Sequence, residues 1–174
     1  MQLPERDEAT TQARLLKRNA GARTAPPPPE VAQAIHDIVA LVRGERRDLA
    51  AIVLDMEGVP DFNRRVYEVA RTIAPGTTLT YGAIATELGL ADARGVGEAL
   101  GQNPFPIIVP CHRVVAAGRR TGGFSARGGI ATKLRLLAIE GARLEDAPTL
   151  FDRDGGLKYE LGGRSTKHRR RLPR

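Results

Sequence analysis

The chain has 174 residues, a single cysteine and a formal net charge of +7 at pH 7. This length suits one ordinary domain with a buried core, so the fold needs no disulfide or metal to hold it together. No apolar run approaches the roughly 20 residues that a membrane helix requires, and the charged opening segment excludes a secretory signal peptide. We therefore expect a cytoplasmic protein with no membrane partner and a reduced thiol.

The positive charge is concentrated in two regions. Residues 61–144 carry 11 Lys and Arg against 6 Asp and Glu, and the last twelve residues hold six basic residues and no acid. A basic domain followed by a basic tail favours binding to nucleic acid. For the tail alone, a solvated segment that only aids solubility is an equal alternative.

The first sixty residues are predicted as a linker followed by a small packed segment. Residues 1–29 are polar and end in four prolines, which is typical of a flexible linker with a stiff, extended end. An amphipathic helix is predicted next, ending near Gly44. Its inward face is formed by four residues at helical spacing, Ile35, Ile38, Val39 and Val42. The apolar run that follows fits either a short strand or an extended connector.

Three helices are predicted between residues 61 and 101. Asp61, Thr80 and Asp92 are their expected N-caps. Their expected inward residues are Phe62, Val66, Val69 and Ile73 in the first helix, Ile84, Ala85 and Leu88 in the second, and Val96, Ala99 and Leu100 in the third. Two short helices joined by a tight glycine-containing connection form a helix-turn-helix signature, which an ordinary helical hairpin shares.

The third of these helices contains Gly95 and Gly97 directly after Arg94. Each glycine weakens a helix by about 0.5–1 kcal/mol relative to alanine, and leaves a bare surface that another backbone can approach closely. A bare surface beside a long cation suits a DNA strand. Close packing between helices explains the glycines equally well.

A last helix is predicted over residues 130–140, with Leu134, Leu137 and Ala138 facing inward. Glu140 lies in its final turn, where the helix dipole disfavours a negative charge by some tenths of a kcal/mol. We therefore expect this carboxylate to have another partner. The candidates are His112, Arg113 and Arg143.

The only cysteine, Cys111, lies in the stretch NPFPIIVPCHRVV, residues 103–115. A nucleophilic thiol needs thiolate character, which a neighbouring imidazole supplies, and His112 follows directly. Adjacent residues of an extended segment point to opposite sides, so His112 reaches the sulfur only through a local bend or a water molecule. In this hypothesis Glu140 orients His112, and His112 takes the proton from Cys111. The competing interpretation is an inert core cysteine, because residues 107–109 favour a buried strand.

Three ordered motifs carry a specific resemblance: TYGAIA, NPFPIIVPCHRVV and KLRLLAIEG. Their order and spacing resemble the O6-alkylguanine-DNA alkyltransferases over roughly half of the chain. The resemblance implies an α+β, mainly helical fold, with a winged-helix-like helix-turn-helix and a short strand pair carrying the cysteine loop. The implied division is a linker over 1–29, a remnant of an N-terminal domain over 30–60, the active-site and DNA-binding domain over 61–145, and a basic tail over 146–174.

The resemblance also implies a function. Such a protein is a monomer that binds double-stranded DNA with alkylated bases, flips O6-alkylguanine or O4-alkylthymine out of the duplex, and transfers the alkyl group irreversibly to Cys111. It uses no cofactor and no metal, because the protein itself is the acceptor. His112 and Glu140 match the family's proton relay, with His112 acting through water, and Asn103 matches the asparagine that holds the active-site turn.

The remaining site residues follow from the same resemblance. For DNA binding, Tyr81 matches the tyrosine that helps to rotate the nucleotide, and Arg94 matches the arginine that fills the vacated space. Gly95 and Gly97 would approach the DNA backbone. The expected contacts to the flipped base are the Cys111 carbonyl, the backbone of Val114, Phe124 and Ser125.

Two departures from the family pattern keep alternatives open. Gly95 stands where the motif usually has alanine, and Phe124 stands where many members have tyrosine. The main alternative is a non-catalytic, alkyltransferase-like lesion sensor, although such proteins lack the acceptor cysteine that Cys111 supplies. A thiol hydrolase and a simple helix-turn-helix regulator explain less, because neither accounts for the stretch around Cys111.

Overall fold

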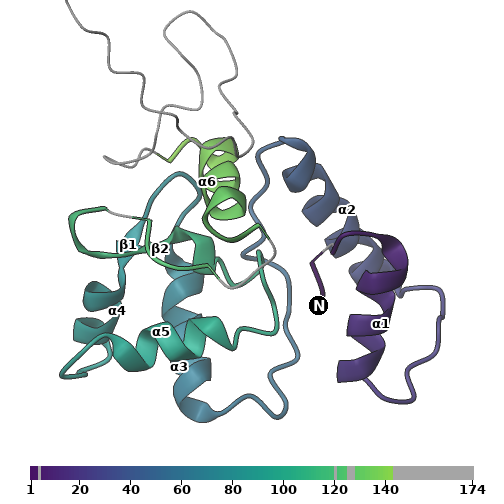
Figure 1. Cartoon of the computed structure of the whole chain (residues 1–174), viewed down its shortest axis with the longest axis horizontal. Coiled ribbons are helices and arrows are strands. Elements are labelled where there is room, and N and C mark those ends of the chain that lie inside the picture. Colours follow the sequence, from purple (N-terminus) through teal and green to yellow (C-terminus); the bar gives the residue numbers. More distant parts are fainter. Residues whose placement is uncertain (4, 120, 125–127, 143–174) are drawn as a thin grey trace, which may run out of the picture.

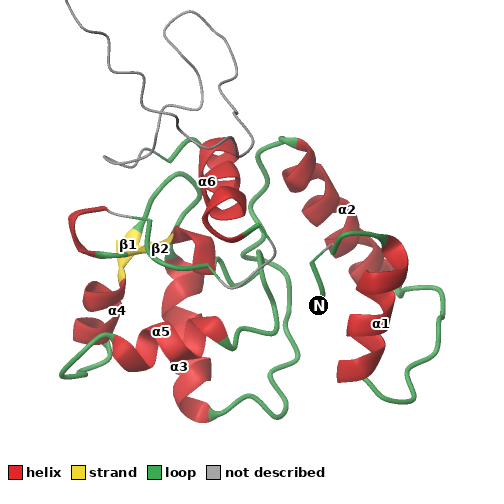
Figure 2. Cartoon of the chain, in the orientation of Figure 1, coloured by secondary structure: helices red, strands yellow, loops and turns green. Residues whose placement is uncertain are grey.

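The structure is a computed structural model that describes residues 1–3, 5–119, 121–124 and 128–142. Figures 1 and 2 show a mainly helical chain with one short strand pair. Its elements are α1 (Glu8–Arg18), α2 (Pro29–Arg43), α3 (Asp61–Thr72), β1 (Leu79–Thr80), α4 (Tyr81–Glu87), α5 (Arg94–Gly101), β2 (Val114–Val115) and α6 (Gly129–Glu140), with 3-10 turns at Cys111–Arg113 and Ala117–Arg119. The mainly helical fold class is confirmed.

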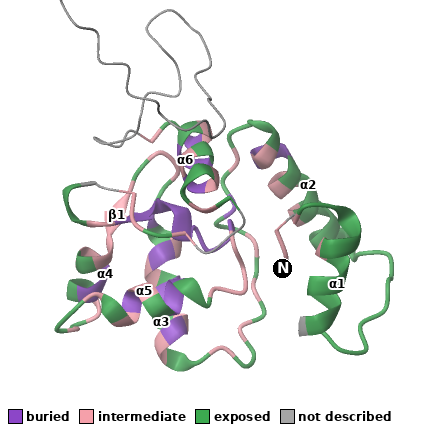
Figure 3. Cartoon of the chain, in the orientation of Figure 1, coloured by how far each residue is buried: buried purple, intermediate pink, exposed green. Residues whose placement is uncertain are grey.

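Helices α3, α4 and α5 pack against one another and form the helix-turn-helix unit. Thr80 caps α4 as predicted, because its side-chain oxygen accepts the backbone N–H of Ala83 at 3.0 Å. Asp92 accepts the N–H of Arg94, while Asp61 is the first helical residue rather than the cap. The predicted inward residues of the three helices all lie in or against the core, whose buried positions Figure 3 marks.

The strand pair joins two distant parts of the chain. β1 and β2 run parallel, with Leu79 opposite Val114 and Thr80 opposite Val115. Tyr81 directly follows β1, and the turn that contains Cys111 directly precedes β2. The pairing therefore fixes the start of α4 beside the cysteine turn.

The strand expected over residues 107–109 is wrong. The segment is buried, but it forms a tight turn in which Ile107 has a φ of 76° and the N–H of Val109 donates to the carbonyl of Phe105 at 2.9 Å. Pro104, Pro106 and Pro110 surround it, and proline lacks the N–H that a strand ladder requires. The prolines therefore convert an apolar run into a turn.

The N-terminal segment differs from the prediction in two ways. Helix α1 lies within the predicted linker, and Asp7 caps it by accepting the N–H of Thr10. On α2, Ile35 and Val39 are 51% and 39% exposed, whereas Leu41 is fully buried. Apolar residues occur on more than one face of α2, and the cluster around Leu41 determined which face turned inward.

The predicted inward face of α6 is only partly correct. Leu137 is buried, but Ala138 is exposed, and two charged residues, Lys133 and Glu140, are buried instead. Both have polar partners within the protein, as described below. The basic tail over 146–174 and Arg143 lie outside the described residues. Among the described helices, none has the length and apolar character needed to cross a membrane.

Candidate active site

Cys111 begins a 3-10 turn that runs to Arg113. Its N–H donates to the carbonyl of Val109 at 2.8 Å, and the N–H of Arg113 donates to the carbonyl of Pro110 at 2.8 Å. The turn replaces the extended backbone in which the side chains of Cys111 and His112 would point to opposite sides. The thiol is free and its residue is only 9% exposed.

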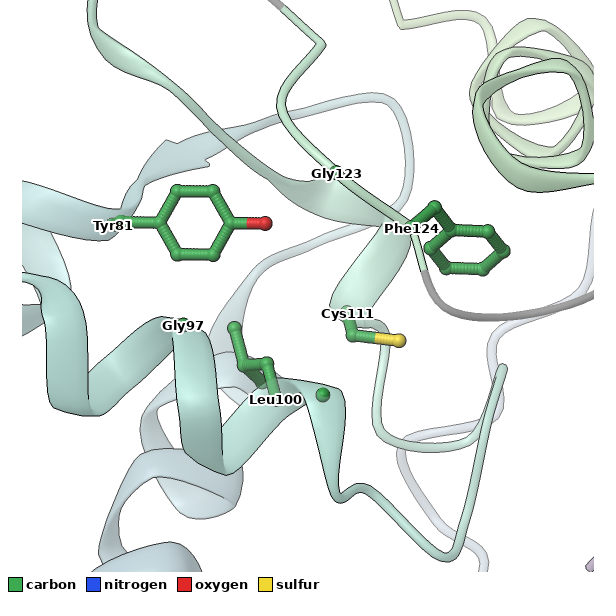
Figure 4. A pocket seen from close by; sticks show the side chains of 7 residues that line it. Tyr81, Gly97, Leu100, Cys111, Gly123 and Phe124 are labelled. Atoms are coloured by element: carbon green, nitrogen blue, oxygen red, sulfur yellow. The ribbon is translucent and has the colours of Figure 1, made fainter.

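A pocket of about 470 Å³ opens beside the sulfur. It lies between α4, α5 and the loop after β2, and Figure 4 shows the residues that line it. They are Tyr81, Gly97, Leu100, Gly101, Cys111, Gly123 and Phe124. Most of these residues are apolar or lack a side chain, and one wall belongs to the helix-turn-helix, so the thiol faces a cavity rather than a sealed core.

Asn103 holds the turn from the side of α5. Its amide nitrogen lies 3.1 Å from the carbonyl of Val109 and 3.6 Å from the sulfur of Cys111. Its side-chain oxygen accepts the N–H of Phe105 at 2.8 Å. One side chain therefore fixes the proline-rich turn and donates to the thiol at the same time.

Glu140 is paired with both residues that follow Cys111. His112 Nε2 lies 2.9 Å from Glu140 Oε1, and Arg113 donates to both carboxylate oxygens at 2.8 and 2.9 Å. Arg113 also donates to the carbonyl of Ile73. The predicted pairing of Glu140 is thus present, with two of its three candidate partners; the third, Arg143, lies outside the described residues.

The electrostatics of this cluster set the resting protonation. Burial raises the pKa of Cys111, although Asn103 and the charge of Lys133 oppose the shift. Burial also lowers the pKa of His112, against the opposing effect of Glu140. Despite its own burial, hydrogen bonds from His112 and Arg113 lower the pKa of Glu140 to about 2. At neutral pH the thiol is therefore protonated, the imidazole neutral and Glu140 ionised.

These states determine the tautomer of His112. An ionised carboxylate only accepts, so His112 Nε2 carries the hydrogen and Nδ1 carries the lone pair. Nδ1 is buried and has no hydrogen-bond partner among the described residues. The ring nitrogen that can accept a proton is the one without a protein partner.

Lys133 is a site residue that the sequence patterns missed. It is 0% exposed, and its ammonium donates to the carbonyl of Val114 at 2.6 Å and to that of Gly123 at 3.4 Å. It also lies 5.8 Å from the centroid of the Tyr81 ring. Helical spacing places residues 133, 136, 137 and 140 on one face of α6, but it equally allows the face that was predicted from Leu134, Leu137 and Ala138.

The residues predicted to contact DNA lie along the helix-turn-helix. Arg94 is exposed at the first position of α5, and Tyr81 is half-buried in the pocket wall. The two glycines differ. A Cβ on Gly97 would have open space, whereas a Cβ on Gly95 would lie 3.2 Å from the Phe62 ring. Close packing against α3 therefore accounts for Gly95, and only Gly97 presents a bare surface at the pocket.

Of the four residues predicted to contact a flipped base, three are described and one is not. Phe124 lies beside the sulfur in the pocket (Figure 4). The backbone of Val114 already has protein partners, since its N–H donates to the Cys111 carbonyl and its carbonyl accepts from Lys133. Ser125 lies outside the described residues. Among those that are described, no group of His, Cys, Asp and Glu is arranged to hold a metal ion.

Comparison with known proteins places this site in context. The family described as the 6-O-methylguanine DNA methyltransferase DNA-binding domain matches residues 61–142. A methylated-DNA–protein-cysteine methyltransferase of Methanothermobacter thermautotrophicus is 38% identical, over 68% of this chain and 66% of that protein. The protein of the same name from Mycobacterium tuberculosis is 41% identical, over 73% of this chain and 75% of its own length. A DNA base-flipping protein of Thermus thermophilus is 44% identical, over 60% of this chain and 69% of that protein.

Solved structures agree with these relatives. The Mycobacterium tuberculosis OGT in complex with DNA superimposes with a TM-score of 0.54 at 41% identity, over 68% of this chain and 71% of that one. The O6-methylguanine-DNA methyltransferase of Pyrococcus kodakaraensis gives a TM-score of 0.60 at 33% identity, over 78% of this chain and 82% of that one. This chain belongs to the methylated-DNA–protein-cysteine methyltransferase family.

Proposed function

We propose that this protein repairs DNA by direct damage reversal, moving an alkyl group from O6 of guanine in duplex DNA irreversibly onto Cys111. One observation carries the proposal: the sulfur faces a pocket beside the helix-turn-helix, and the next residue is a buried histidine paired with a carboxylate. The names of the relatives support the substrate class.

His112 is the general base in this proposal. A water molecule between Nδ1 and the sulfur carries the thiol proton to the imidazole, and Glu140 stabilises the imidazolium that forms. The resting pKa values oppose this transfer, because the thiol holds its proton tightly and the imidazole accepts one reluctantly. The thiolate is therefore a minor form of the free protein at neutral pH.

The transfer itself needs no cofactor. The sulfur forms a bond to the alkyl carbon while the bond between that carbon and O6 breaks, and the electron pair of the broken bond stays on the guanine. The proton held on His112 then goes to the guanine ring. The products are unmodified guanine and S-alkylcysteine, so each protein molecule reacts once.

The helix-turn-helix provides the DNA contacts. Arg94, exposed at the start of α5, occupies the space of the extruded base, and Tyr81 helps to rotate the nucleotide toward the pocket. Extruding a base costs a few kcal/mol of stacking and pairing, which contacts of this kind offset. The backbone of Gly97, which has open space beside it, is the proposed site of closest approach to the duplex.

The flipped base is held inside the pocket by backbone groups and an aromatic side chain. The Val114 carbonyl has a second lone pair beyond its bond to Lys133, so it still accepts from a base, as does the Cys111 carbonyl. Phe124 packs on the base but offers no hydroxyl, and Ser125 is a further proposed contact. The 2-amino group of O6-alkylguanine can donate to these carbonyls. O4-alkylthymine is a further proposed substrate, but it has no N–H to donate and would bind without these two hydrogen bonds. The protein acts as a monomer in the cytoplasm, where its thiol stays reduced.

The decisive experiment incubates the protein with duplex DNA that contains one O6-methylguanine and measures the mass of the peptide containing Cys111. We expect a single added methyl group, lost in Cys111→Ser and unchanged in Arg135→Met, which alters an exposed residue of α6. The similarity to a base-flipping protein favours one alternative, a non-catalytic lesion sensor. Tight binding of the lesion without methyl transfer would establish the sensor and refute the enzyme.

A further inference from the structure

The buried side of α6 carries a charge that the proposed reaction does not use. Lys133 is completely buried, between α6, β2 and the pocket loop. The other buried cation, Arg113, is neutralised by Glu140. Within the part of the chain that the structure describes, no carboxylate pairs with Lys133. A buried ammonium without a counterion is costly unless its surroundings compensate for the loss of water.

The three groups around the ammonium belong to three parts of the active site. Val114 follows the cysteine turn, and its N–H donates to the carbonyl of Cys111. Gly123 and Tyr81 both line the pocket. Lys133 donates to the carbonyls of Val114 and Gly123 and lies near the Tyr81 ring. One side chain therefore connects the cysteine turn, the pocket loop and the start of α4.

The charge also acts on the titratable groups that surround it. It lowers the pKa of Cys111, against the larger effect of burial, and lowers that of His112. Burial in turn lowers the pKa of Lys133 to about 8, although the interaction with Cys111 opposes that shift. Lys133 is therefore largely protonated at neutral pH. In a site with little water, a cation at this place stabilises negative charge on the sulfur more strongly than it would in solvent.

We propose that Lys133 is a positioning residue of the active site, which braces the pocket walls through Val114, Gly123 and Tyr81 and places a buried positive charge beside the cysteine turn. The inference deepens the proposed alkyl transfer and rests on it for its biological meaning. A leucine at this position would pack on the buried face of α6 without the cost of burying an ammonium. The lysine therefore serves the site rather than the core.

The test compares Lys133→Met with wild type and with Arg135→Met. Arg135 lies on the same helix, is exposed and donates to the Val42 carbonyl, so its loss removes one positive charge away from the pocket. The first measurement is the pH dependence of Cys111 alkylation by iodoacetamide. The second is the single-turnover rate of methyl transfer from O6-methylguanine duplex DNA.

For Lys133→Met we expect the midpoint of the iodoacetamide profile to rise by about one pH unit. Transfer at pH 7 should slow about three- to tenfold, because a smaller thiolate fraction is partly offset by a more nucleophilic sulfur. Arg135→Met should leave both measurements unchanged. Lys133→Arg keeps the positive charge, so its midpoint should rise less than that of Lys133→Met.

An unchanged midpoint in folded Lys133→Met would overturn the proposal. Should that variant not fold, Lys133→Gln keeps a donor but loses the charge, and the same comparison applies to it. The thiol measurement uses no DNA, so the two proposals fail separately. A shifted midpoint in a protein that transfers no methyl group would leave the role of Lys133 standing and refute the enzyme.

Discussion

Glu140 is a buried carboxylate that its partners stabilise in the ionised form. At the end of α6 the helix dipole disfavours its charge by some tenths of a kcal/mol. Its hydrogen bonds to His112 and Arg113 outweigh that penalty, and its pKa falls to about 2. Because Arg113 also donates to the Ile73 carbonyl, the carboxylate helps to tie α6 and the cysteine turn to the end of α3.

Glu140→Gln should destabilise the fold by about 3–5 kcal/mol, because it leaves the buried Arg113 without a counterion. Urea denaturation at pH 7 measures this loss, and Glu68→Gln, an exposed change on α3, is the matched control.

Since the pKa of Glu140 is lower in the folded state, its stabilisation is complete above about pH 4.5 and is lost as the pH falls toward 2. Glu140→Gln should lack this acid dependence. Equal stability of both variants at pH 7 would contradict the structural role.

At the scale of elements, α3 fixes the end of α5 that leads into the active site. The Tyr67 hydroxyl donates to the Ala99 carbonyl at 2.8 Å, and the Asn63 amide donates to the Gln102 side chain at 3.0 Å. Asn103, which donates to the sulfur, is the next residue. The position of α5 and the position of the thiol are therefore linked through a few hydrogen bonds.

The two glycines of α5 should respond differently to alanine. Gly97→Ala should stabilise the fold by about 0.5–1 kcal/mol, because the new methyl enters open space and alanine is the better helix former. Gly95→Ala should gain little or lose stability, since its methyl would crowd the Phe62 ring. Denaturation curves of both variants test this difference.

The affinity for duplex DNA provides a second test of Gly97. If Gly97 approaches the duplex closely, Gly97→Ala weakens DNA binding while the fold becomes more stable. A Gly97→Ala variant with both higher stability and unchanged affinity for duplex DNA would remove this glycine from the interface.

Over the whole molecule, helix caps and helix faces could be predicted from neighbouring residues, whereas features that depend on distant residues were predicted less well. Thr80 as a cap and the inward faces of α3 to α5 follow from spacing alone, and all are confirmed. The pairing of Glu140 with His112 was predicted because an acid at a helix end needs a partner. The turn at Ile107 was missed, because an apolar run looks like a strand unless its flanking prolines are weighed more heavily.

Lys133 was missed for a different physical reason. A lysine in a helical pattern is ordinarily read as exposed, and only the fold brings the carbonyls of Val114 and Gly123 to its ammonium. The same limit applies to α2, where the sequence offers several apolar faces and the partner cluster selects one. When the partners of a residue are distant in sequence, periodicity alone does not determine whether that residue is buried or exposed.

The charge of the whole molecule leads to the last prediction. The last twelve residues hold six of the 27 basic residues and no acid, so they add a large share of the charge available to phosphates. Binding that neutralises phosphates releases counterions, and the logarithm of the affinity then falls with the logarithm of the salt concentration in proportion to the number of contacts. Deleting residues 163–174 should therefore flatten that slope for undamaged duplex DNA, measured by fluorescence anisotropy between 50 and 200 mM salt, roughly the range in which such contacts dominate. The reaction of the truncated protein with free O6-benzylguanine should not change, because the deletion leaves every described residue that lines the pocket in place. A slope identical to that of the full chain would assign the tail to solubility and leave DNA binding to the helix-turn-helix.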